Sequence, residues 1–215
     1  MATLSATSAV IARKLLDENN TVVSGVQIRT AINDAIKYWK RRAFWFNEFS
    51  ETITLTIGNP AFSLVTNTPI FLFEKGGAVI VENMIRYPLT KITSEKYDLL
   101  NIQAPGRPFA WTYRNQGFEL YSYPDQAYSM VCRGIKDYAD FATDGADDGN
   151  TSDFLTHAEL LIQYWALSRL HGEYRQDEKM ESYYTARAKD EFENLKEFNA
   201  DKDSTGTNEV HSFLI

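Results

Sequence analysis

The pattern of hydrophobic and polar positions changes its period along the chain, starting with a helical repeat. Val10, Ile11, Leu15 and Leu16 follow this repeat, and the polar run "DENNTVV" is expected to end the first helix. A second helix is predicted to start at Ser24, because Ser24 and Gln27 have the spacing of a capping box. The apolar face of this second helix comprises Ile28, Ala31, Ile32, Ala35, Ile36 and Trp39.

From Glu48 to about Tyr138 the period becomes two, which is typical of half-buried strands. The predicted strands are "ETITLTI", "FSLV", "AVIVENMIRY" and "YSMVCRGIKDYA". The stretch "FAWTYRNQGFELYSYP" predicts a hairpin that turns near Asn115 and Gly117. Between these strands, "TSEKYDLLN" predicts a short helix capped by Thr93 or Ser94. The middle of the chain is therefore expected to form an antiparallel β module.

The helical period returns after the acidic loop "TDGADDGNTSD". One helix is predicted to begin near Thr156, with Glu159 three residues later. A last helix repeats Met180, Tyr184, Ala188, Phe192 and Leu195 at intervals of three or four. Two helices thus precede the β module and two follow it.

These elements predict an α+β fold, mainly a helical bundle with an inserted antiparallel β module and an extended C-terminal tail. The expected boundaries place residues 1–47 and 150–198 in the bundle, 48–149 in the β module and 199–215 in the tail. We expect Phe44, Trp45 and Phe46 to be buried between the helical and β parts. The shared helical core is expected to contain Ile32, Ile36, Trp39, Leu161, Tyr164 and Trp165.

Composition and charge narrow the class of protein. The chain has 215 residues, of which 44% are hydrophobic, and this suffices for a globular core. Its 29 acidic and 22 basic residues give a net charge of −7, which argues against tight nucleic-acid binding. The single cysteine, Cys132, cannot form an internal disulfide. No signal peptide or membrane-spanning run is predicted, and no membrane partner is expected.

The sequence offers little catalytic chemistry. It has no Gly-rich phosphate loop, HExxH motif, paired CxxC or nucleophile elbow. His157, His171 and His211 are far apart, without the spacing of metal ligands. No acidic pair can be selected for glycoside hydrolysis. We therefore expect no catalytic residues, no cofactor and no metal site.

A calcium site in the acidic loop is the main alternative. With Asp144 placed first in an EF-hand loop, Asp148 and Gly149 fall at the fifth and sixth positions. Ala146 and Leu155 then occupy the third and twelfth positions, where ligands are required. A structural turn, with Asp153 near the start of the following helix, is the favoured interpretation.

Several segments together resemble the head-to-tail adaptor proteins of tailed bacteriophages, of the connector-ring and tubular tail protein A type. They include "AINDAIKYWKRRAFWFNE", "TITLTIGNPAFSL", "YPLTKITSEKYDLLN", "ELYSYPD" and "DDGNTSDFL". The closing helices "LIQYWALSRLHGEYRQDE" and "YYTARAKDEFENLK" extend the resemblance, which runs from about residue 8 to 198. The insertion "VTNTPIFLFEKGG" departs from the family pattern.

The resemblance implies a structural, non-enzymatic subunit of a homo-oligomeric ring, expected to be a dodecamer. This ring joins the portal protein to the next tail component, a tail tube or nozzle, and DNA passes through it without specific binding. Such a protein is located in the virion, at the junction of head and tail, and is made in the host cytoplasm. The alternative hypothesis is a virion-associated peptidoglycan hydrolase at the same position of the tail.

Two regions are predicted to bind partners. Residues 199–208 are almost without apolar side chains and are expected to be flexible. The apolar residues that follow, Val210, Phe213, Leu214 and Ile215, are expected to dock on the portal or on a neighbouring subunit. The hairpin tip, formed by Asn115, Gln116 and Gly117, is expected to contact the next tail component.

Overall fold

The chain folds into two compact units with an α+β composition, as predicted. The computed structural model describes residues 2–16, 22–64, 69–73, 76–100, 105–114 and 117–206, and side chains through residue 200. The helical unit comprises Met1–Asn47 and Tyr138–Ile215, and the β unit comprises Glu48–Asp137. Residues 138–149, which were predicted to belong to the β module, therefore group with the helices.

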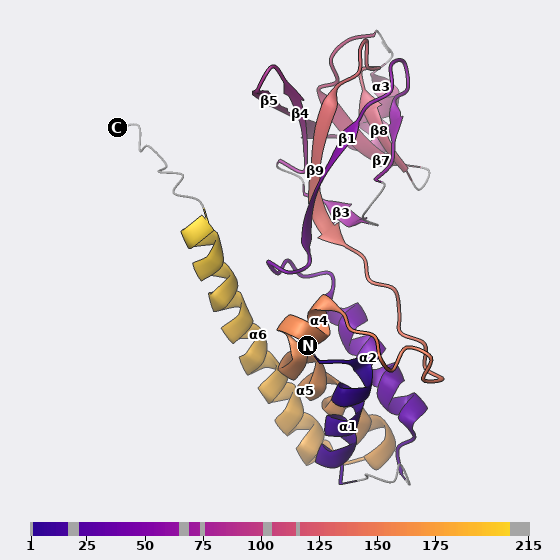
Figure 1. Ribbon diagram of the computed structural model, residues 1–215, viewed down its shortest axis with the longest axis vertical. Helices are drawn as coiled ribbons and strands as arrows, with labels where there is room; N and C mark the ends of the chain where they lie inside the picture. Colours follow the sequence, from indigo (N-terminus) through magenta and orange to yellow (C-terminus); the bar gives the residue numbers. More distant parts are fainter. Residues whose placement is uncertain are drawn as a thin grey trace. The chain divides into compact units, whose positions relative to one another are not determined.

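The helical unit is built around α5 (Figure 1). Its helices are α1 (Leu4–Lys14), α2 (Gly25–Trp39), α4 (Asp153–His157), α5 (Glu159–Leu170) and α6 (Glu178–Gly206). A π-helical turn, η1 (His171–Arg175), connects α5 to α6. Helix α5 packs against α1, α2 and α6, so that the two N-terminal and two C-terminal helices share one core.

The predicted start and buried face of α2 are confirmed. The Gln27 backbone N–H donates to Ser24 Oγ, and the Ser24 N–H donates to Gln27 Oε1 over 2.7 Å. All six residues of the predicted apolar face are buried. The predicted shared core is confirmed as well, with Tyr164 and Trp165 partly buried at its edge.

The third bundle helix begins differently from the prediction. Ser152 caps α4, because its Oγ accepts a hydrogen bond from the Leu155 N–H over 3.3 Å. Thr156 lies inside α4 and donates its hydroxyl to Ser152 O, so neither helix begins at Thr156. Helix α5 then starts at Glu159 without a side-chain cap.

Phe44 and Phe46 are buried in the helical core, where they stack at 5.1 Å and meet Phe154 edge-on. One prediction for the helical unit is corrected. Helix α6 continues to Gly206, so the described part of the predicted tail, residues 199–206, is helical. The Trp45 N–H donates to Asn199 Oδ1 over 2.7 Å, which ties this stretch of α6 to the unit.

The β unit contains two sheets. The first has the order β1 (Glu48–Thr54), β9 (Ser129–Lys136), β4 (Ala78–Glu82) and β5 (Ile85–Pro88), and β3 (Pro69–Leu72) also pairs with β9. The second has the order β2 (Ala61–Phe62), β8 (Gly117–Tyr121), β7 (Ala110–Arg114) and β6 (Thr90–Lys91). Helix α3 (Ser94–Leu99) is capped by Thr93, as one of the two predicted alternatives. Because β6 and β7 run parallel, the β unit is not purely antiparallel.

The strands differ from the prediction in two places. The stretch "AVIVENMIRY" is not one strand but the hairpin β4–β5, which turns at Asn83 and Met84. Strand β3 lies in the segment that departs from the family pattern, and the sequence did not predict it. Gly134 permits β3 to approach β9, because a Cβ at this position would lie 2.2 Å from Phe71 O. Of the helices described, none combines the length and the apolarity that a membrane crossing requires.

Candidate functional site

The structure describes only one of the seven predicted partner-binding residues. Gly117 is the first residue of β8 and pairs with Arg114 of β7, which confirms the predicted hairpin. Its neighbours in the turn, Asn115 and Gln116, lie outside the described residues. The four apolar residues of the C-terminal segment, Val210, Phe213, Leu214 and Ile215, lie outside them too.

The base of the β7–β8 hairpin is fixed by charge. Arg114 Nε donates to Glu119 Oε2 over 2.7 Å on β8, and Arg114 Nη1 pairs with Asp98 of α3. The guanidinium also lies 4.7 Å from the ring centre of Tyr97, whose burial raises its pKa to about 12. The Tyr97 hydroxyl donates to Leu120 O over 3.2 Å. Helix α3 is thus anchored to the hairpin, which holds Gly117 at a defined place in the β unit.

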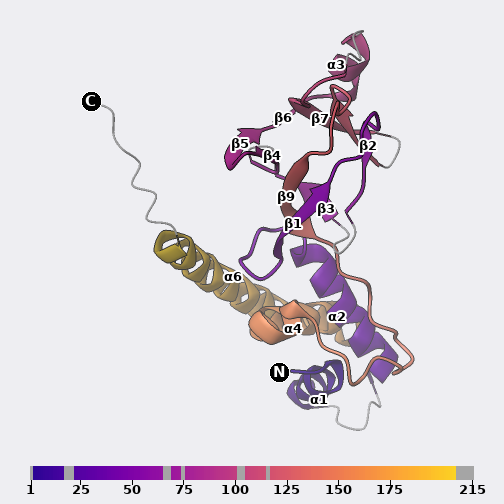
Figure 2. The ribbon, with the colours of Figure 1, turned by 45° about the horizontal axis from the view of Figure 1, so that its top comes forward.

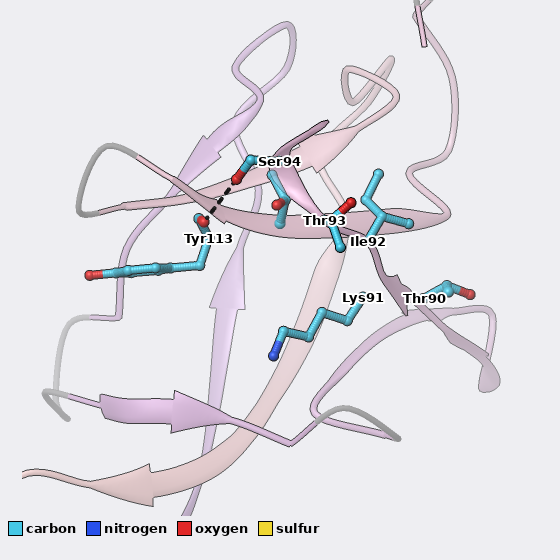
Figure 3. Close-up of a pocket in the computed structure, with 7 residues that line it drawn as sticks. Thr90, Lys91, Ile92, Thr93, Ser94 and Tyr113 are labelled. Atoms are coloured by element: carbon cyan, nitrogen blue, oxygen red, sulfur yellow. Dashed lines mark hydrogen bonds between the residues drawn. The ribbon is translucent and has the colours of Figure 1, made fainter. Parts of the chain in front are cut away.

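A polar hollow lies where β6 meets the start of α3 (Figure 3). Its volume is about 470 Å³, and its lining includes the hydroxyl side chains of Thr90, Thr93 and Ser94. Ser94 Oγ donates to Tyr113 O over 3.4 Å. Lys91 is the charged side chain of this lining, and no histidine or carboxylate is among the residues that line the hollow. The hydroxyl groups of the lining can form hydrogen bonds with a partner.

An apolar cavity of about 170 Å³ opens elsewhere in the β unit, and we call it the β3–β8 cavity. Its lining residues are Ile70, Phe71, Leu72, Lys91, Trp111, Tyr113 and Phe118. The ring of Phe118 lies 5.9 Å from Trp111 and 5.1 Å from Tyr113. The lining is mostly aliphatic and aromatic, which suits an apolar side chain.

The helical unit has a wider groove of mixed charge, about 670 Å³ in volume, between α2, α5, η1 and α6. The rings of Tyr38 and Trp165 stack at 4.3 Å along it. Arg169 Nη1 donates to Asp34 Oδ2 over 2.7 Å, and its other nitrogens bind Glu173. Arg169 thus joins two carboxylates of the groove wall, one on α2 and one on η1.

The carboxylates of the acidic loop are engaged in the loop itself and in α2. Asp148 binds Arg29 of α2 through two hydrogen bonds of 2.7 Å, and Arg29 lowers the pKa of that carboxyl. Asp144 accepts from the Ala146 N–H, and Asp147 accepts from the Ala142 N–H. These contacts are those of a structural turn.

The acidic loop also contacts the first turns of α1 and α4. Backbone carbonyls of Asn150 and Asp148 accept from Leu4 and Ser5, the first N–H groups of α1. Asp153 is the first residue of α4, as predicted, and its carboxylate accepts from the Tyr138 hydroxyl over 2.9 Å. Burial raises the pKa of Tyr138 above its usual value. The loop therefore braces α1, α2 and α4.

The titratable side chains that the structure describes do not gather into a metal-binding cluster. No group of three or more His, Cys, Asp and Glu side chains in the described ranges is arranged to share a metal ion. His157 lies against Phe46 at 5.5 Å, and His171 is buried against Tyr184 at 5.4 Å. His211 lies outside the described residues. Cys132 is buried, and desolvation raises its pKa to about 12, so it is not a reactive thiolate at neutral pH.

One exposed feature was not predicted from the sequence. Met84 is 98% exposed and Ile85 is 54% exposed at the β4–β5 turn. The signal in the sequence is the pair "EN", two poor strand formers, within an otherwise apolar run. The alternation of that run led to its interpretation as a single strand.

Comparison with known proteins supports one family. No curated protein matches the chain. The model of one protein family, described as SU10 adaptor protein, matches residues 2–211 and so spans both units. This match confirms the resemblance to phage adaptors that was recognised in the sequence. Because it covers nearly the whole chain, the protein belongs to the SU10 adaptor protein family.

Proposed function

We propose that this protein is a structural head-to-tail adaptor of a bacteriophage, a subunit of a ring that joins the portal to the tail. The family match over residues 2–211 carries this proposal. Two features of the chain support it. The described hollows are lined by hydroxyl, aromatic and ion-paired side chains, which suit protein contacts. The net charge of −7 suits a ring, expected to be dodecameric, through which DNA passes without being held.

Two surfaces of the chain are assigned to partners in this proposal. The apolar C-terminal residues, Val210, Phe213, Leu214 and Ile215, dock on the portal or on a neighbouring subunit. The hairpin tip at Asn115, Gln116 and Gly117 contacts the next tail component. The ion pairs of Arg114 with Glu119 and Asp98 support the second assignment, because a base that is already ordered loses little conformational entropy on binding.

The portal assignment is tested by mixing the purified protein with its portal and separating complexes on a density gradient. The full chain should comigrate with the portal, and deletion of residues 209–215 should abolish or strongly reduce this binding without shifting thermal unfolding. A matched variant keeps the length of the segment but carries Val210→Ser and Phe213→Ser, and it should fail in the same way. Equal binding by all three proteins would contradict a role for these side chains.

The structural, non-enzymatic role is tested with the same preparation. Protein added to purified cell walls should leave their turbidity unchanged, whereas a lysozyme control clears them. Release of soluble peptidoglycan fragments by the adaptor, at a rate proportional to its concentration, would instead establish the hydrolase alternative.

A further inference from the structure

The β4–β5 hairpin presents an apolar tip to the surroundings of the β unit. Glu82 pairs with Ile85, so Asn83 and Met84 form a two-residue turn. The side chain of Met84 is 98% exposed and that of Ile85 is 54% exposed. Exposure of two adjacent apolar side chains on a rigid turn does nothing for the core of the unit.

The backbone of the turn gives a second reason to assign Met84 a role outside folding. Asn83 has φ +51° and Met84 has φ +65°, as the mirror-image turns of hairpins require. Asn tolerates this left-handed conformation, but the second position favours Gly, because a Cβ there crowds the backbone. Met84 therefore lowers the folding stability relative to Gly at this position. A residue that is unfavourable for the turn yet present there points to a role outside folding.

The β3–β8 cavity is a matching receptor on the same unit. Its volume of about 170 Å³ is close to that of apolar cavities of about 150 Å³ that hold a benzene molecule, and a methionine side chain is of similar size. The rings of Trp111, Tyr113 and Phe118 provide the aromatic contacts that a thioether sulfur favours. Phe71 and Tyr113 are themselves 39% and 54% exposed, so the lining reaches the surface.

The β4–β5 hairpin and two strands that contribute to the cavity lining, β3 and β7, lie on different sides of the β unit. In Figures 1 and 2, the β4–β5 hairpin projects from one side, while β3 and β7 lie toward the other. A knob and a hole on different sides of one unit cannot meet within the chain, but they can join successive copies head to tail. Contacts of this kind close into a ring when the rotation between successive copies divides a full turn, and otherwise form a filament.

We propose that the Met84–Ile85 tip of one copy inserts into the β3–β8 cavity of a second copy of this chain. This contact rests on the proposed function, because a ring of identical subunits requires two complementary surfaces on each subunit. The proposed contact identifies the two surfaces as the Met84–Ile85 tip and the β3–β8 cavity.

Replacement of Met84 provides the first test, with two readouts of opposite direction. Met84→Gly should leave the thermal midpoint unchanged or higher, because Gly relieves the left-handed strain. The same variant should raise the protein concentration needed for half-assembly at least about tenfold, as for loss of a buried contact residue. Met84→Leu keeps an apolar knob and should assemble within about threefold of the wild type. Assembly of Met84→Gly at the wild-type concentration would overturn the proposal.

Crosslinking of single-cysteine variants identifies the contact directly. Ile85→Cys places a thiol beside the retained Met84, and Tyr113→Cys places one at the cavity, while the native Cys132 is buried and unreactive. A short bismaleimide should link the two variants only when they are mixed, and should produce a ladder of multimers when both changes are in one chain. Linkage of Ile85→Cys to itself, or no linkage in the mixture, would overturn the proposed contact.

The outcomes separate this contact from the proposed function. If the wild type binds the portal as a ring but the mixture gives no linkage, the contact is wrong and the adaptor function stands. If the mixture is linked but no ring forms on the portal, the contact stands and the proposed function fails.

Discussion

Replacement of Trp39 by alanine tests the helical core on which the adaptor is built. Trp39 is 4% exposed at the end of α2, with its ring 5.5 Å from Trp165 of α5 and 4.8 Å from Phe192 of α6. A buried tryptophan removes up to about 200 Å² from water, or about 5 kcal/mol at 25 cal/mol per Å². No hydrogen bond is lost, because the buried Nε1–H has no acceptor in the described part of the chain. We expect Trp39→Ala to lower the free energy of unfolding by about 3–5 kcal/mol.

Urea unfolding followed by circular dichroism at the helical band measures this loss. The helical unit carries α1, α2, α5 and α6, so the signal reports mainly on the unit that contains Trp39. Trp39→Phe is the matched control, since it keeps a ring against Phe192 and should cost less than half as much. A loss below about 1 kcal/mol for Trp39→Ala, with an unchanged urea slope, would refute the placement of Trp39 in a shared core.

Three further predictions concern titratable groups. Arg29 lowers the pKa of Asp148, so this carboxylate stabilises the fold above its unfolded pKa of about 3.9 and loses that effect as the pH falls through its lowered folded pKa. Asp148→Asn should therefore reduce the thermal midpoint at pH 7, and the difference from the wild type should shrink as the pH falls below about 3.9; a constant difference would contradict the ion pair. Burial lowers the pKa of His171, and neither ring nitrogen has a partner in the described structure, so its neutral form is favoured and stability falls as the pH drops below about 6.5. His171→Phe, which keeps a ring against Tyr184, should lose less thermal stability between pH 7 and pH 5 than the wild type, and an equal loss would exclude His171 as the cause. Burial raises the pKa of Cys132 to about 12, so a thiol reagent should label it only after unfolding, and rapid labelling of the native protein would show that it is accessible.

Features that depend on short-range interactions were predicted well from the sequence. The capping box of Ser24 and Gln27 and the cap at Thr93 involve residues three positions apart, so local spacing is sufficient to find them. The apolar face of α2 follows from its period, because one helix face must be buried. The β7–β8 hairpin was predicted from alternation and a Gly at the turn.

Features that depend on distant partners were not predicted. The acidic loop belongs to the helical unit because Asp148 binds Arg29 and because Asn33 exchanges two hydrogen bonds with the backbone of Phe141. No pattern within the loop encodes these contacts. Helix α6 continues past residue 198 although few apolar residues follow, because helical backbone hydrogen bonds do not require burial.

In the candidate site, too, the feature set by local sequence was predicted and the features set by distant contacts were not. The sequence predicted the β7–β8 tip, but not the exposed Met84 or the β3–β8 cavity. A turn without Gly is hard to recognise within an alternating run, so the β4–β5 hairpin was interpreted as one strand. The cavity combines side chains of β3, from one sheet, with side chains of β6, β7 and β8, from the other, so it exists only in the folded β unit.

Electron microscopy of the protein mixed with its portal would show whether the chain forms a ring between portal and tail. We expect particles in which a closed ring of adaptor subunits covers one face of the portal and surrounds an open channel. Images of bare portals, at adaptor concentrations well above those of the portal and with a correctly folded adaptor in solution, would contradict it.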